Sequence, residues 1–265
     1  MTFRDWIMRT YLDCKSAQRY KNNTVEFGDF RIPPNYKSVF VDTFSRDYKE
    51  NWESGSSWWG QPYHPGNLIE WYDDEQIVQG MDMIELRAVK KSKNFIENGS
   101  IITKPNAVGN IRSKMGWKYG IYIISAKMPR GKWLWPALWF SGIAHWPPEI
   151  DLVEAYSENT ENYEDNKHIT TNIHWGSGDQ QDDYGARWHR MPNDVINEYI
   201  EYTLWWEADF IKIYYNGYLV LSVTNRTILD GMFEEMQIII GNGFEKENTI
   251  CRSPLYVNSV EIYQK

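Results

Sequence analysis

The chain has 265 residues and a formal net charge of −8, with 42% hydrophobic and 24% charged residues. This length and composition fit one large β-sandwich or barrel with a sizeable core. The sequence contains no basic block, so we expect neither nucleic acid nor a membrane as a partner. The aromatic fraction is high, at 16%. A core uses part of these side chains, and the others predict a surface that binds flat apolar faces, such as those of sugar rings.

The first 20 residues differ from the rest of the chain. Their apolar side chains recur at helical spacing, at Phe3, Trp6, Ile7, Tyr11 and Leu12. This pattern predicts a short helix in an N-terminal extension, residues 1–37, which packs on the domain or attaches it to a partner. Charges at Arg4, Asp5 and Arg9 leave no apolar segment for a signal peptide, and no later window is long and apolar enough to span a membrane. The sequence therefore leaves the cellular location open.

From residue 38 to the C-terminus the pattern is that of a β protein. Short runs rich in β-branched and aromatic residues follow one another, separated by turn residues. Asn216-Gly217 lies between two such runs and predicts a tight hairpin turn. About ten or more strands in one chain predict an all-β fold of two packed antiparallel sheets, a jelly-roll sandwich over residues 38–265.

A loop rich in turn formers, GSSWWGQPYHPGN, precedes most of the strands. It contains Trp58, Trp59, Tyr63 and His64. Loops lie on the surface and often carry binding residues. We therefore predict that these side chains form the rim of a cleft and that Trp58 and Trp59 contact a ligand.

The run EIDLVE, which begins at Glu149, places three carboxylates in an apolar strand. Side chains alternate between the two faces of a strand, so Glu149 and Asp151 share a face and Glu154 points to the other. One bulged residue between Asp151 and Glu154 returns Glu154 to the first face. Because bulges are common next to active sites, we predict one near Leu152 and Val153.

A row of three carboxyls on one strand face suits nucleophilic and acid–base chemistry. With the bulge, the Cα atoms of Glu149 and Glu154 lie roughly four strand steps apart, about 13 Å at ~3.3 Å per residue. Their side chains can lean inward to a separation of about 5–5.5 Å, the range for retaining glycoside hydrolysis. The three carboxyls cannot all ionise freely, so at least one keeps its proton to higher pH. A solvated strand face and a calcium site are the alternatives that the pattern leaves open.

Several stretches together resemble glycoside hydrolase family 16, in the bulged form found in laminarinases, agarases and carrageenases. EIDLVE is similar to the family signature E-x-D-x-x-E. The other stretches, in the right order, are VFVDTF, SKMGWKYGIYIISAKMPRGKWLWPALWF, TTNIHWG, YTLWWEADFIKIYYNG and YVNSVEIYQ. The resemblance implies a substrate cleft across a concave sheet and retaining hydrolysis of a β-linked polysaccharide without a cofactor.

The resemblance also implies roles for individual residues. Glu149 matches the nucleophile, Asp151 the assisting carboxylate and Glu154 the acid/base. The positions expected to bind substrate are Trp135, Trp139, His174, Trp206 and Asn242. For the tryptophans and the histidine, the alternative is packing in the core.

Two departures from the family affect the expected substrate and metal. Ile123 and Ser125 stand where the family often has a Glu and an Arg that line the cleft. Asn258 replaces an Asp that often helps to hold a structural calcium, so calcium is disfavoured and we expect no metal in the site.

The leading hypothesis is an endo-acting, retaining β-glycanase that works as a monomer on a polysaccharide, first of all a β-1,3-glucan such as laminarin. One alternative is a hydrolase of a red-algal galactan, such as agar, porphyran or carrageenan. A second alternative, of another class, is a non-catalytic carbohydrate-binding module.

Overall fold

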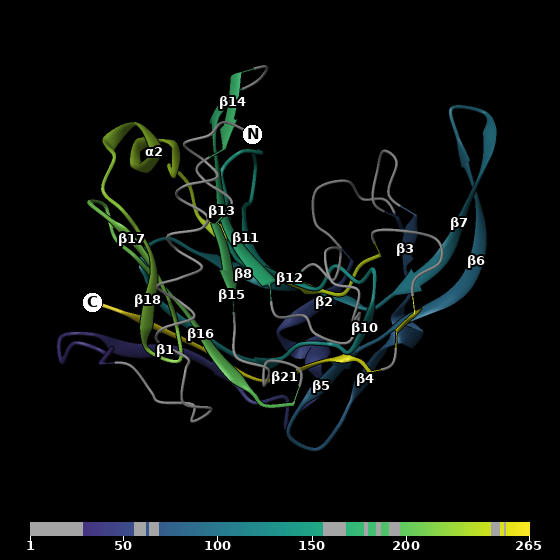
Figure 1. The fold of residues 1–265 in the computed structure, drawn as a ribbon, viewed down its shortest axis with the longest axis horizontal. Helices are drawn as coiled ribbons and strands as arrows, with labels where there is room; N and C mark the ends of the chain where they lie inside the picture. Colours follow the sequence, from purple (N-terminus) through teal and green to yellow (C-terminus); the bar gives the residue numbers. More distant parts are fainter. Residues whose placement is uncertain are drawn as a thin grey trace.

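The computed structural model describes residues 29–55, 62–63, 69–155, 168–177, 180–183, 187–190, 197–244, 250–251 and 253–265. Nearly all regular structure in these ranges is β-strand (Figure 1). The helical elements among them are α2 (Arg226–Gly231), η1 (Tyr48–Glu50) and η2 (Asp74–Gln76), the last two being 3-10 turns. The predicted N-terminal helix lies outside the described residues. Within them, no helix has the length and hydropathy needed to cross a bilayer.

One sheet of the sandwich, here called sheet 1, has eight strands. Their order is β18 (Tyr218–Val223), β17 (Ile211–Tyr215), β16 (Ile200–Trp206), β9 (Gly120–Lys127), β21 (Leu255–Gln264), β5 (Ile84–Leu86) and β4 (Ile77–Gln79), with β1 (Lys37–Asp42) paired to β21. Neighbouring strands in it are antiparallel.

The opposing sheet, sheet 2, also has eight strands. Their order is β14 (Gln180–Asp183), β13 (His168–Ser177), β12 (Glu149–Ala155), β11 (Ala137–Gly142), β19 (Met236–Gly241), β8 (Asn110–Trp117) and β2 (Trp52–Ser54), with β15 (Arg187–Arg190) paired to β13. Neighbours are again antiparallel. The strand that carries the three carboxylates, β12, therefore lies inside the sheet, between β11 and β13.

Two smaller sheets complete the described structure. One has the order β3 (Glu70–Tyr72), β7 (Ser100–Val108) and β6 (Ala88–Glu97), and the other pairs β10 (Gly131–Lys132) with β20 (Ile250–Cys251). β3 runs parallel to β7. β6 and β7 form a long hairpin that projects at the right of Figure 1.

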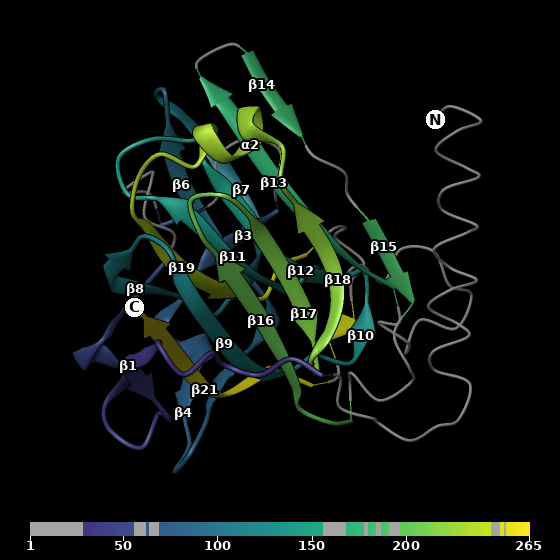
Figure 2. The same cartoon turned by 90° about the vertical axis from the view of Figure 1, so that its left-hand side faces the viewer.

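The two large sheets pack face to face, with the core between them. Figure 2 shows β16, β17 and β18 of sheet 1 in front of β11 and β12 of sheet 2. Tyr122 of β9 and Phe140 of β11 are both fully buried, and their ring centroids are 5.0 Å apart. The predicted all-β jelly-roll sandwich of antiparallel sheets is thereby confirmed.

The predicted hairpin between β17 and β18 is also confirmed. Asn216 and Gly217 both have positive φ, 45° and 78°, and Tyr215 pairs with Tyr218 across the turn. A two-residue turn of this kind fixes the register of the strands that it joins. In this register the side chains of Ile213 and Tyr215 of β17 point into the core.

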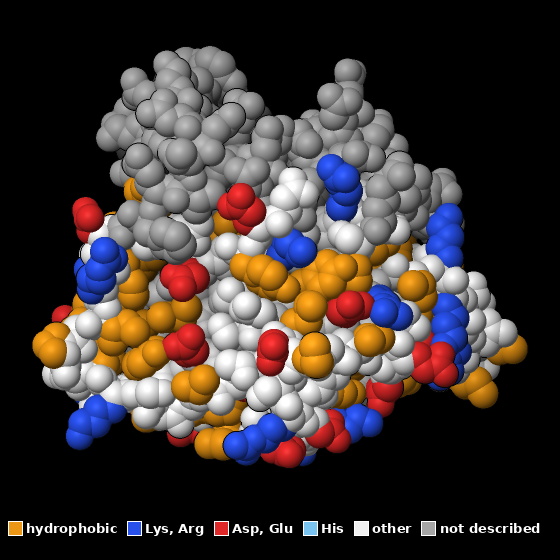
Figure 3. All heavy atoms as spheres, turned by 90° about the horizontal axis from the view of Figure 1, so that it is seen from below, with side chains coloured by type: hydrophobic (Ala, Val, Ile, Leu, Met, Phe, Trp, Pro, Cys, Tyr) orange, Lys and Arg blue, Asp and Glu red, His pale blue; other side chains and the backbone are white. Residues whose placement is uncertain are grey.

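The face of the molecule seen from below Figure 1 carries a mixture of side-chain types. Acidic and basic side chains are interspersed with hydrophobic ones across its described part (Figure 3). Opposite charges this close together cancel much of each other's field.

Candidate active site

The middle of β12 contains the predicted bulge. Leu152 and Val153 together lie opposite the single residue Thr171 of β13. Both side chains are fully buried in the core. Because these two residues occupy one pleat, Glu154 returns to the face of Asp151, as the spacing predicts.

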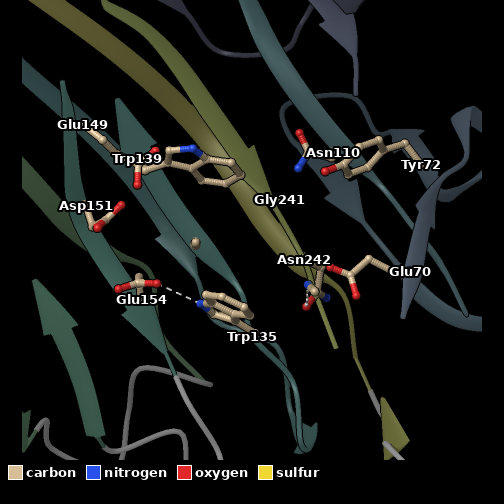
Figure 4. Close-up of a pocket in the computed structure, with 12 residues that line it drawn as sticks. Glu70, Tyr72, Asn110, Trp135, Trp139, Glu149, Asp151, Glu154, Gly241 and Asn242 are labelled. Atoms are coloured by element: carbon tan, nitrogen blue, oxygen red, sulfur yellow. Dashed lines mark hydrogen bonds between the residues drawn. The ribbon is translucent and has the colours of Figure 1, made fainter. Parts of the chain in front are cut away.

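Three carboxyls of β12 line one pocket, with a cavity of about 180 Å³. The pocket residues are Glu70, Tyr72, Asn110, Trp135, Ala137, Trp139, Glu149, Asp151, Glu154, Gly241, Asn242 and Gly243. In Figure 4 the carboxyls form a row at one side, and the rings of Trp139 and Trp135 separate this row from Glu70, Asn110 and Asn242. The pocket is therefore an acidic cleft with an aromatic centre.

Glu149 is held by two aromatic side chains. Its Oε2 accepts a hydrogen bond of 3.1 Å from the indole Nε1 of Trp146, and its Oε1 lies 3.6 Å from Nε2 of His174. Burial raises the pKa of Glu149 well above its usual range, and the charges of Asp151 and Glu154 raise it further. His174 and the Trp146 hydrogen bond oppose this rise, because both favour the ionised carboxylate.

His174 reaches the carboxyl row from the neighbouring strand, where it pairs with Glu149 in the β12–β13 register. Its Nε2 lies 3.2 Å from Oδ2 of Asp151 and 3.1 Å from the side-chain nitrogen of Asn172. The ring of Trp146 lies beside it, with centroids 6.0 Å apart. The structure thus places His174 in direct contact with the row, where the sequence predicts a cleft residue.

Glu154 has a different set of partners. The indole Nε1 of Trp135 donates to its Oε1 at 2.9 Å, and Oγ1 of Thr170 donates to its Oε2 at 3.3 Å. Trp135 therefore lines the pocket and also orients Glu154. The two glutamates of the row consequently have separate environments, which permits separate chemical roles.

Residues 69–244 match the sequence profile of glycosyl hydrolases family 16. This chain belongs to that family. The matched range contains β12 and all the pocket residues named above.

Two proteins with related sequences are similar to this family 16 chain. A beta-1,3-glucan-binding protein of Penaeus monodon is 24% identical over 233 residues, which cover 70% of this chain and 62% of that protein. The glucan endo-1,3-beta-glucosidase A1 of Niallia circulans is 28% identical over 209 residues, which cover 72% of this chain and 29% of that protein. The chain thus spans less than two thirds of the length of either relative.

A solved structure shares the fold. The laminarinase catalytic domain from Thermotoga maritima MSB8 superposes with a TM-score of 0.68 at 19% identity, over 87% of this chain and 98% of that domain. The likeness shows that the family 16 chain has the fold of that domain.

The prediction that Trp206 binds substrate is wrong. Its side chain is 1% exposed and lies in the core, edge-on to Tyr119. Side chains alternate along β16, so Trp206 points inward, and its neighbour Trp205 packs outside sheet 1 against Phe210. Neither faces the pocket, because β16 belongs to the sheet opposite the row.

The predicted cleft-rim loop is described only in part. Trp58, Trp59 and His64 lie outside the described residues. Tyr63 is 4% exposed and packs against Phe95 of β6, at 4.7 Å between ring centroids, so it forms part of a small core rather than a rim.

The other predicted positions, Trp139 and Asn242, do line the pocket. Glu70, Tyr72 and Asn110 line the same cavity and were not predicted from the sequence. Glu70 and Tyr72 come into place through the parallel pairing of β3 with β7, and no local motif marks that pairing. Trp146 was not predicted either, although its position three residues before the first carboxylate could have indicated it.

Two carboxyls of the row and His174 could also hold a cation. Ligand atoms of Glu149, Asp151 and His174 all lie within 4.8 Å of one another. The expectation that this family 16 protein needs no metal or cofactor stays a prediction.

Proposed function

We propose that the protein is an endo-acting, retaining β-glycanase that cleaves β-1,3-glucan. The observation that carries this proposal is the row of three carboxyls, which one bulged strand turns into a single pocket. Family membership supports the reaction class. The names of both relatives support β-1,3-glucan as the substrate, since one is a beta-1,3-glucan-binding protein and the other a glucan endo-1,3-beta-glucosidase.

In the first step, a carboxylate oxygen of Glu149 attacks the anomeric carbon while the bond to the leaving oxygen breaks. Glu154 gives its proton to that oxygen. In the second step Glu154 takes a proton from water, the water oxygen attacks the anomeric carbon, and the bond to Glu149 breaks.

The environments of the carboxyls favour this assignment. Trp146 and His174 both favour the ionised form of Glu149, as a nucleophile requires. Asp151, 4% exposed, lies between the glutamates in the row and repels a charge on either. Because the three carboxyls ionise in coupled steps, the row does not lose all its protons at once, as a nucleophile and an acid in one cleft require.

The charge of the pocket favours an uncharged glycan over a sulfated galactan. Among the described lining residues, four are acidic and none is Lys or Arg. Among these described residues a sulfate group would meet like charge, which is unfavourable in a partly desolvated cleft. Neutral glucan hydroxyls avoid this cost.

A second candidate function is non-catalytic glucan binding, because one relative is named as a binding protein. The carboxyl row argues against it. Three neighbouring, mutually repelling carboxyls, of which Asp151 is buried and the two glutamates are partly buried, destabilise a fold, and binding a neutral sugar does not require them.

The decisive experiment measures new reducing ends on laminarin, mixed-linkage glucan, agarose and carrageenan. We expect cleavage of laminarin by the wild-type protein and its loss in Glu149→Gln. Binding to laminarin without cleavage would favour the binding function. Cleavage that persists in Glu149→Gln would refute the assigned nucleophile.

A further inference from the structure

A second group of polar side chains lines the pocket across the two tryptophans from the carboxyl row. It consists of Glu70, Tyr72, Asn110 and Asn242, here called the far wall. Figure 4 shows these side chains together at one side of the cavity and the carboxyl row at the other. The catalytic steps above use none of them.

Glu70 has an oxygen without a partner. The residue is 5% exposed, and its Oε2 is buried and makes no hydrogen bond. Burial raises the pKa of Glu70 to about 7, although the charge of Lys104 and backbone hydrogen bonds oppose this rise. Buried polar atoms in native proteins are nearly always hydrogen-bonded, so an unpaired one that lines a cavity indicates a missing ligand or water.

Asn110 shows the same feature independently. It is 3% exposed, and its Oδ1 is buried without a partner. Its side chain comes from β8 and fills the space beside Gly241, where an added Cβ would lie 2.4 Å from the Asn110 amide nitrogen. The glycine thus admits the Asn110 amide to the wall of the cavity.

Asn242 is different, because both of its amide atoms are used within the protein. Its Nδ2 donates to the carbonyl of Leu86 at 3.4 Å, and its Oδ1 accepts from the backbone of Gly243 at 3.1 Å. It therefore shapes the wall and leaves recognition to Glu70 and Asn110.

The chemistry of the two unpaired atoms selects the ligand. An amide oxygen is only an acceptor, and a carboxyl with a pKa near neutral can accept or donate. Sugar hydroxyls are both donors and acceptors. The rings of Trp135 and Trp139 lie between the far wall and the row, so a saccharide chain can pass over apolar faces from one to the other.

We propose that Glu70 and Asn110 bind hydroxyl groups of a neutral sugar unit displaced along the chain from the cleaved bond, and so determine which glucans are positioned for cleavage. This inference rests on the proposed function, since it takes the ligand to be a β-1,3-glucan. It assigns the far wall a role in specificity and none in bond breaking.

The test uses Glu149→Gln as the background, so that ligands stay intact. Calorimetry measures the Kd of β-1,3-linked glucose oligomers of increasing length. We expect Glu70→Leu and Asn110→Ala each to weaken the longer oligomers about tenfold, and to leave unchanged the shortest oligomers that bind at the row. Glu201→Leu, on the outer face of sheet 1, is the matched control and leaves every Kd unchanged.

Thermal unfolding of each variant separates binding from folding. If Glu70→Leu does not fold, Asn110→Ala carries the test alone. Normal oligomer binding with unchanged Kd in the folded far-wall variants would overturn this inference and leave the proposed function intact. Absence of oligomer binding in the Glu149→Gln background would overturn both.

Discussion

The hydroxyl of Tyr215, on β17 of sheet 1, donates a 2.8 Å hydrogen bond to the backbone carbonyl of Leu152 in sheet 2. Leu152 is one of the two bulge residues of β12, and a bulge leaves backbone groups outside the regular ladder. A buried carbonyl without a partner is costly. The sheet opposite the cleft thus stabilises the backbone irregularity on which the carboxyl row depends.

Replacing Tyr215 by Phe tests this link. We expect Tyr215→Phe to lower the free energy of unfolding by about 1–3 kcal/mol, because the Leu152 carbonyl loses its donor. We also expect kcat on laminarin to fall, because Glu154 follows the bulge. Tyr122→Phe is the matched control: its hydroxyl donates to the carbonyl of Tyr119 elsewhere in the core, so stability falls and kcat does not. An equal loss of kcat in both variants would show that the bulge is not specially dependent on Tyr215.

The bulge itself could be predicted from the sequence, but its support could not. The two-then-three spacing of Glu149, Asp151 and Glu154 conflicts with strand alternation, and one extra residue resolves the conflict. The partner Tyr215 lies 63 residues further on and meets Leu152 only when the two sheets pack. The spacing of residues within one strand can be seen in the sequence, whereas a contact between two sheets can be predicted only when the topology of the whole fold is known.

The tryptophans and the far wall show the same limit. Trp139 of β11 and Trp135, which precedes that strand, face the cleft, whereas Trp206 of β16 faces the core, yet all three occur in similar aromatic runs. Residue type alone does not determine whether a side chain faces the cleft or the core. Glu70 joins the pocket only through the β3–β7 pairing.

The indole N–H of Trp146 should set the acidic limb of the activity profile. It donates to Glu149 and lowers the pKa of that carboxyl, so Trp146→Phe removes a group that favours ionisation. The pKa of Glu149 then rises, and a higher pH is needed to ionise the nucleophile. We expect the acidic limb of the kcat/KM profile to move to higher pH. Trp205→Phe, which loses an indole N–H bonded to Tyr36 on the outer side of sheet 1, leaves the profile in place. A shift to lower pH in Trp146→Phe would contradict the assigned hydrogen bond.

The carboxyl row should also lower the free energy of unfolding at neutral pH. The pKa of Glu149 is raised in the folded protein, so folding favours its protonated form. The stability that this group contributes is therefore present at low pH and is lost as pH rises through the raised value. We expect Glu149→Gln to melt at a higher temperature than wild type at pH 7, with the difference vanishing near pH 4. Asp230→Asn, at an exposed ion pair on α2, should change the melting temperature little at either pH. A constant difference across this range would rule out titration as the cause.

The raised pKa of Glu70 allows a second titration test, between about pH 4.5 and about pH 7. Its pKa is raised from 4.5 to about 7, chiefly by burial, a shift equivalent to about 3 kcal/mol. Because the folded value is the higher one, wild type loses stability relative to Glu70→Gln as pH rises from about 4.5 to about 7. We expect the difference in free energy of unfolding to grow by about 3 kcal/mol over this interval and to level off above it. Chemical denaturation of both proteins at pH 4.5, 6, 7 and 8 measures the change. A difference that does not change with pH would mean that folding leaves the pKa of Glu70 unchanged, as for a glutamate in water, and would contradict its burial in the far wall.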